Sequence, residues 1–148
     1  MKSIGIIQKY IPEFEEVVGQ MQFDLFHVYT VDEHTFKVVR NMRQMHIHYS
    51  EEFKLEHELI NKLPKIEILY LAGLFHDLGK GKGGDHSKIG AKTSLQFAKK
   101  IGLSRADADL ISWLVLNHLE MSSISQKKDI SDPDTINTFS ELVITTER

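Results

Sequence analysis

The chain has 148 residues, 18 basic and 21 acidic side chains, a net charge of −3, eight histidines and no cysteine. Its length and its hydrophobic fraction of 41% are typical of one globular domain and exclude a disordered or fibrous chain. The lack of cysteine excludes disulfides, zinc fingers and a thiol nucleophile, and the mild negative charge argues against a nucleic-acid binder. Because no apolar run reaches the ~20 residues that span a membrane and no secretion signal is present, we expect a cytoplasmic protein without a membrane partner.

Helical periodicity dominates, and we find neither a repeat nor a strand pair, so the sequence predicts an all-α fold. A capping box at Thr30–Glu33 predicts one helix start, and prolines suited to a first helical turn predict two others. A polar stretch over 122–131 is expected to interrupt the helical pattern. The expected helices cover 11–21, a segment that starts at Thr30, 50–63, 66–78, 87–101, a segment from Ser104 to His118, and a segment from Asp132 to about Ile144.

Lysines alternate with glycines over residues 79–84, which we call the glycine–lysine loop. Lys80 lies four residues after His76, so the two are neighbours at one helix end. Glycines let the backbone bend closely around a ligand, and Asp85 and His86 begin the next helix, where free backbone donors favour anions. Taken alone, such a loop is a solvated surface turn. Beside His76 and Asp77, it indicates a phosphate-handling site.

Three histidines lie on apolar helix faces. His34 precedes Val38 by four residues, His118 follows Leu114 by four, and His76 lies on the most apolar helix, directly before Asp77. A single inward histidine is more often a hydrogen-bonded core residue. Three of them with a carboxylate favour a metal site, because buried charges must be paired or bound to a metal. The polar surroundings of the other histidines predict surface positions for His46, His48 and His57.

Five segments together resemble a known superfamily: FHVYTVDEHT at 26–35, LFHDLGKG at 74–81, GGDHS at 83–87, NHLEMS at 117–122 and DISDPD at 129–134. A histidine, a His-Asp pair and a distant aspartate, all on helices, resemble the HD-domain metal-dependent phosphohydrolases. The combined segments are similar to the central HD domain of the bifunctional uridylyltransferase/uridylyl-removing enzymes of bacterial nitrogen control. The resemblance extends over nearly the whole chain.

The resemblance implies a helical bundle with a metal site at its centre. Residues 1–22 would form an N-terminal linker helix that packs on an HD phosphohydrolase domain at 23–148, and the chain would be a fragment of a longer multidomain protein. One or two divalent ions are implied, of Mn, Mg, Fe, Zn or Co. The implied first-ion ligands are His34, His76, Asp77 and Asp129, with Asp132 and Asp134 as alternatives to Asp129, and His86 and His118 would hold the second ion.

The activity that the resemblance implies is hydrolysis of a uridylyl group from a tyrosine of the PII signalling protein. Glutamine, sensed by domains outside this chain, would favour it. The expected catalytic residues are Asp77, Lys80 and His86. Asp77 would bridge two ions, and Lys80 would neutralise negative charge on the phosphoryl oxygens. His27 is given only an accessory role. Two alternatives remain: an HD hydrolase of free nucleotides or cyclic dinucleotides, and a catalytically silent helical interaction module.

Overall fold

A computed structural model describes residues 5–21, 29–145 and 147–148. These residues confirm the all-α fold, since the described part of the chain forms helices and a single isolated bridge between Met21 and Thr30. In chain order the elements are α1 (Ile6–Tyr10), the 3₁₀ helix η2 (Pro12–Val17), α2 (Val31–Ile47), α3 (Lys54–Ile60), α4 (Ile66–Phe75), α5 (His86–Lys100), α6 (Arg105–Leu116), α7 (Glu120–Lys127) and α8 (Pro133–Val143). None of the described helices is long and apolar enough to cross a membrane.

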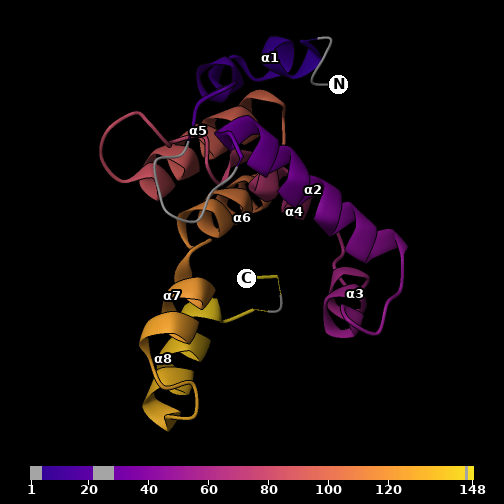
Figure 1. Ribbon diagram of the computed structural model, residues 1–148, viewed down its shortest axis with the longest axis vertical. Helices are drawn as coiled ribbons and strands as arrows, with labels where there is room; N and C mark the ends of the chain where they lie inside the picture. The colour runs from indigo at the N-terminus through magenta and orange to yellow at the C-terminus, as the bar shows by residue number, and fades with distance from the viewer. Residues whose placement is uncertain (1–4, 22–28, 146) are drawn as a thin grey trace.

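The core lies where α2, α4, α5 and α6 pack together, with α4 between α2 and the α5–α6 pair (Figure 1). Phe75 at the end of α4 is fully buried, and its ring lies 5.0 Å from that of Phe97 on α5. Because α4 is apolar on almost every face, it is buried from several sides, as the sequence predicts. The His-Asp pair directly follows this buried helix, and Asp77 itself is buried.

The N-terminal segment contributes to the same core. Phe14 and Val17 of η2 are buried, and Ile11 before them is 4% exposed. Asp32, at the start of α2, is also fully buried, and its Oδ1 accepts hydrogen bonds from the backbone of Gly19 and the hydroxyl of Thr30. The predicted domain boundary between residues 22 and 23 lies outside the described residues.

Helices α7 and α8 extend away from the bundle (Figure 1), and neither buries any residue. The start of α8 agrees with the sequence, because Asp132 caps it by accepting hydrogen bonds from the backbone of Asp134 and Thr135. The predicted interruption over 122–131 is wrong, since α7 occupies Glu120–Lys127. This helix is polar and packs little, so it lacks the hydrophobic period that reveals a buried helix face.

Other helix ends also differ from the prediction. The segment expected as a helix over 11–21 is the shorter 3₁₀ helix η2, and the helix expected over 50–63 is limited to Lys54–Ile60. The helix start predicted at Thr30 is confirmed, because Thr30 is the N-cap of α2, but its side chain caps no backbone amide and its hydroxyl donates to Asp32 Oδ1 at 2.6 Å. The helix start predicted at Ser104 is confirmed, because its hydroxyl oxygen caps α6 by accepting from the backbone of Asp107 at 3.1 Å.

Candidate metal centre

Asp77 is a buried carboxylate at the centre of a cluster of half-buried histidines. Helix α4 ends at Phe75, and the turn that follows directs the side chain of Asp77 into the bundle, where the residue is 2% exposed. The surrounding side chains come from four places in the chain: His34 from α2, His76 from the end of α4, His86 from the start of α5 and His118 from the segment after α6. The structure therefore brings together five of the six predicted metal ligands.

The two carboxylate oxygens of Asp77 face different histidines. Oδ2 lies 3.6 Å from Nε2 of His34 and 3.2 Å from Nε2 of His76. Oδ1 lies 3.9 Å from Nε2 of His86 and 3.8 Å from Nε2 of His118. Two groups of three candidate ligands result, with Asp77 in both, and within each group the ligand atoms lie within 4.8 Å of one another. This is the arrangement expected of a carboxylate that bridges two ions.

Backbone carbonyls orient two of the rings. Nδ1 of His76 lies 2.8 Å from the carbonyl oxygen of Gly73, and Nδ1 of His118 lies 2.7 Å from that of Val115. Because a carbonyl only accepts, each Nδ1 carries the proton and donates it. In the neutral ring the lone pair is then on Nε2, the atom that faces Asp77, which is how metal-binding histidines are usually held.

His86 gives an independent indication that the cluster suits a cation. Its Nε2 is buried and has no hydrogen-bond partner among the described residues. A buried polar nitrogen without a partner is unfavourable, and native proteins rarely leave one so. A divalent cation between this nitrogen, His118 and Asp77 would satisfy it, and nitrogen and oxygen donors are the ligands that such cations accept. The residues present therefore fit a metal ion.

The charges around Asp77 keep it ionised. Burial acts to raise the pKa of Asp77, but hydrogen bonds and positive charge from Lys80 and from the protonated form of His76 outweigh burial and hold it well below its usual range. Lys80 Nζ lies 2.9 Å from Asp77 Oδ2. For His118, burial and the neighbouring His76 lower the pKa, and the hydrogen bond to the Val115 carbonyl only partly opposes them. A carboxylate and a neutral imidazole are the protonation states that bind metals.

The glycine–lysine loop is held against two other parts of the protein. A Cβ on Gly79 would lie 2.9 Å from the backbone Cα and C of His86, so a side chain here would displace the start of α5. Gly81 has a φ of +78°, and the side chain of Gln20 occupies the space that a Cβ on Gly81 would need. Lys82 forms an ion pair of 2.8 Å with Glu16. The contacts with Gln20 and Glu16 could not be predicted, because contacts between residues about sixty positions apart leave no local pattern in the sequence.

Comparison with known proteins agrees with this geometry. The family model described as HD domain matches residues 31–141. The chain belongs to the HD domain family. It is 52% identical over its whole length to the bifunctional uridylyltransferase/uridylyl-removing enzyme of Chromobacterium violaceum, and 51% and 50% identical over 97% of its length to the enzymes of that name from Azotobacter vinelandii and Pseudomonas fluorescens. The chain spans 16–17% of the length of these relatives, and no solved structure matches it.

The aspartate predicted to complete the first ligand group is not brought to the HD centre. Asp129 lies exposed between α7 and α8, and its carboxylate accepts a hydrogen bond of 2.8 Å from the backbone of Ser131. Neither alternative joins the groups, since Asp132 caps α8 and Asp134 is exposed in its first turn. Asp129 as a ligand thus stays a prediction without support from geometry. His27 lies outside the described residues.

Two other expectations need correction. The free backbone donors expected at the start of α5 are occupied, because Asp85 Oδ1 accepts from the amides of Ser87 and Lys88 at 3.0 and 3.3 Å. Of the histidines expected at the surface, only His48 is exposed. His46 and His57 are half-buried: His46 Nδ1 lies 3.1 Å from the Tyr70 hydroxyl, and His57 Nδ1 donates to the Met45 carbonyl at 2.7 Å.

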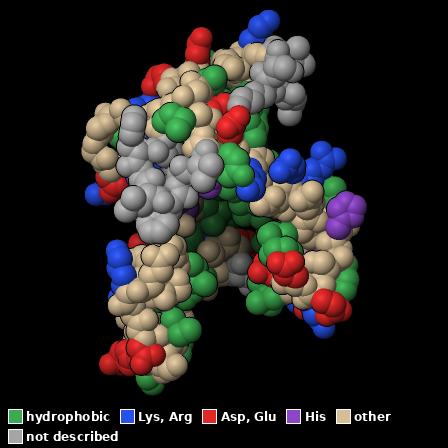
Figure 2. Space-filling view, viewed as in Figure 1, with side chains coloured by type: hydrophobic (Ala, Val, Ile, Leu, Met, Phe, Trp, Pro, Cys, Tyr) green, Lys and Arg blue, Asp and Glu red, His purple; other side chains and the backbone are tan. Residues whose placement is uncertain are grey.

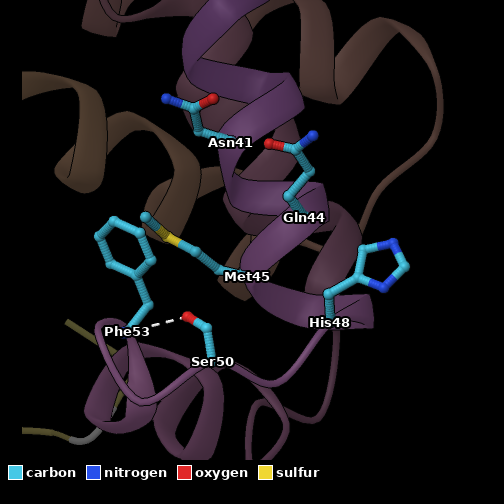
Figure 3. A pocket seen from close by; sticks show the side chains of 6 residues that line it. All are labelled: Asn41, Gln44, Met45, His48, Ser50 and Phe53. Carbon is cyan, nitrogen blue, oxygen red and sulfur yellow. Dashed lines mark hydrogen bonds between the residues drawn. The ribbon is translucent and has the colours of Figure 1, made fainter.

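Away from the candidate metal centre, a hollow of about 210 Å³ lies at the far end of α2 beside α3 (Figure 3). It is lined by Asn41, Gln44, Met45, His48, Ser50 and Phe53. In the close-up the ring of His48 points away from Met45 and Phe53, and no carboxylate lines the hollow. The groups suited to hydrolytic chemistry are therefore those around Asp77.

Proposed function

We propose that this HD domain is a metal-dependent phosphodiesterase that hydrolyses uridylyl-tyrosine on the PII signalling protein and releases UMP. Family membership and the similarity to uridylyl-removing enzymes support a phosphohydrolase role. The observation that carries the proposal is the position of Asp77 between two pairs of histidines, with one carboxylate oxygen toward each pair. The absence of a candidate spanning helix among those described agrees with a reaction in the cytoplasm.

The ligands have separate tasks in this proposal. His34, His76 and Asp77 would hold one divalent cation, and Asp77, His86 and His118 a second. Bound there, such cations lower the pKa of a coordinated water toward ~7 and neutralise charge on phosphoryl oxygens. The carbonyls of Gly73 and Val115 fix two of the rings, so little reorganisation is needed before binding.

Lys80 supplies fixed positive charge beside the same carboxylate. Its side chain is 22% exposed, and Nζ lies 2.9 Å from Asp77 Oδ2, so the ammonium group is at the edge of the centre where a phosphoryl group would approach. Oriented positive charge stabilises the charge that develops on phosphoryl oxygens in the transition state. The leaving phenolate of a tyrosine has a parent pKa near ~10, so it needs less proton donation than an alkoxide would.

The test is turnover of uridylylated PII by the purified chain loaded with Mn²⁺, followed as release of UMP. We expect UMP release, and slower hydrolysis of a panel of free nucleotides and cyclic dinucleotides. His76→Ala should abolish release, whereas His48→Ala, which alters an exposed histidine away from the centre, should retain it. Faster turnover of free or cyclic nucleotides than of uridylylated PII would contradict the proposed substrate. Equal activity of His76→Ala and wild type would contradict the site.

A further inference from the structure

An apolar recess opens directly beside the metal centre. Its aliphatic walls come from Val38 and Met42 of α2, Leu69 and Ala72 of α4, and Leu114 of α6, and His76 and His118 line it as well. Its volume is about 400 Å³, within the range of pockets that hold small organic groups. Hydrophobic side chains gather in the hollow between α2 and α7 in the space-filling view (Figure 2).

We infer that this recess binds the phenyl ring of the esterified tyrosine and makes the enzyme selective for aryl esters. The inference rests on the proposed function, because it assigns one part of the substrate of that same site. A group seated in the recess is held next to His76 and His118, two of the histidines that face Asp77. The phosphorus atom joined to that group would then lie at the metal centre.

The chemistry of the walls favours the tyrosine ring over the uracil ring. Uracil carries two carbonyls and an N–H at its edge, and burying them without partners is unfavourable. The polar side chains that line the recess are His76 and His118, whose Nδ1 atoms already donate to the carbonyls of Gly73 and Val115 and whose Nε2 atoms face Asp77. A phenyl ring needs no such partner, since its one oxygen is the ester oxygen at phosphorus.

Met42 and Gly73 lie close together in one wall of the recess. A Cβ on Gly73 would lie 2.9 Å from Met42 Sδ and 3.1 Å from Met42 Cε, so the lack of a side chain at Gly73 lets the thioether lie close against α4. A methionine thioether is adaptable and makes favourable contacts with aromatic rings. The wall that α2 and α4 share is thus apolar and polarisable, as binding of an aromatic group requires.

The test compares two esters of UMP whose leaving groups have similar acidity, the phenyl ester and the hexafluoroisopropyl ester, with the Mn²⁺-loaded chain. Because the two leaving groups have similar acidity, the metal centre should cleave both bonds with similar ease. A difference in kcat/KM between the two esters is then due to binding of the ring. We expect the wild-type chain to prefer the phenyl ester by about tenfold or more. Val38→Phe, which fills the recess, should remove most of that preference through loss of the phenyl ester. Val38→Ala should raise the KM for the phenyl ester by roughly threefold.

The control is Ile47→Phe, which adds the same ring on α2 at a position that is 53% exposed and outside the recess. It should retain the preference. Hydrolysis of both esters with equal kcat/KM by the wild-type chain, or an equal loss for both in Val38→Phe, would overturn the assignment of the tyrosine ring and leave the proposed function standing. An equal loss is also the result expected if the recess binds uracil or is covered by another protein segment. Failure of the wild-type chain to hydrolyse either ester would overturn the proposed function and the inference together.

Discussion

Replacing Gly79 with alanine should displace His86 and selectively weaken one of the two proposed metal sites. The new Cβ would meet the carbonyl oxygen of His86 most closely and would lie 2.9 Å from the Cα and C of the same residue, whereas ordinary contacts begin near 3.4 Å, so the backbone of His86 must move by more than about 0.5 Å. The obstacle is backbone, which cannot rotate away as a side chain can. A functional site is held to about this tolerance, and disturbing the support of a ligand typically costs about 10- to 100-fold in metal affinity.

The assay is calorimetric titration of the chain with Mn²⁺. We expect two bound ions in the wild type, and in Gly79→Ala one site near wild-type affinity and a second weakened by about 10- to 100-fold, or about 1.4–2.7 kcal/mol. Gly83→Ala is the matched control in the same loop: its φ of +73° makes alanine strained, but a Cβ there would meet nothing within 4 Å. Gly83→Ala should therefore lose some stability and retain both sites. Two unaltered sites in Gly79→Ala would refute the reasoning.

Three further predictions concern charge, packing and pH. Lys80→Met should lower kcat by about 10²- to 10³-fold while Mn²⁺ binding persists, because it removes the positive charge beside the phosphoryl group. Phe75→Ala should lower the free energy of unfolding by about 3–5 kcal/mol in urea denaturation, because the side chain is fully buried. Asp107→Asn should destabilise the chain at neutral pH, because the hydrogen bond and charge of Lys65 lower the pKa of Asp107. The stabilising effect is fully present above the unfolded-state pKa, so the difference from wild type should shrink as the pH falls below 3.8 and through the lower folded-state value.

Each of these predictions has a control or a result that would contradict it. Wild-type kcat in Lys80→Met would show that its ammonium group takes no part in the reaction. For Phe75→Ala, Phe53→Ala removes the same side chain at a residue that is 36% exposed, and an equal loss at both positions would contradict the packing. For Asp107→Asn, the control is Asp109→Asn on the same helix, where Arg105 Nε lies 3.7 Å away. A constant difference between Asp107→Asn and wild type across the whole pH range would contradict the ionic explanation.

The buried part of the site could be predicted from the sequence because its residues lie in periodic apolar helices. His34 and His118 share faces with Val38 and Leu114, and both rings do lie at Asp77. The His-Asp pair was expected at the end of the most apolar helix, and α4 carries it there. In each case burial and helical spacing, which are both visible in the sequence, determine where the side chain points.

What could not be predicted depends on contacts or on competition between polar groups. Thr30 has a capping-box sequence, but its hydroxyl is oriented to donate to the buried carboxylate of Asp32, which also accepts a hydrogen bond from the amide of Gly19. The partners of His57 and Asp85 are likewise set by geometry between segments or within a turn. For Asp129, spacing along the chain gave no information on where the segment between α7 and α8 lies relative to the bundle.

The apolar recess was equally invisible in the sequence. Val38 and Leu114 carry the ordinary pattern of a core, so their periodicity predicts burial and does not distinguish a filled interior from a pocket wall. Only the arrangement of α2, α4 and α6 shows that these half-buried side chains leave space beside His76. A hydrophobic pattern therefore identifies which face of a helix is turned inward, and only the tertiary structure shows whether that face fills the core or lines a pocket.

The most direct test of a metal-dependent hydrolytic centre at Asp77 is metal analysis of the purified, Mn²⁺-loaded chain and of its His76→Ala variant. Release of UMP from uridylylated PII is measured on the same samples. The structure predicts at least one equivalent of Mn²⁺ in the wild type, and loss of both metal and hydrolysis in His76→Ala, because Nε2 of that ring lies 3.2 Å from Asp77 Oδ2. Less than one equivalent of metal in the wild type, together with unchanged hydrolysis in His76→Ala, would contradict the account.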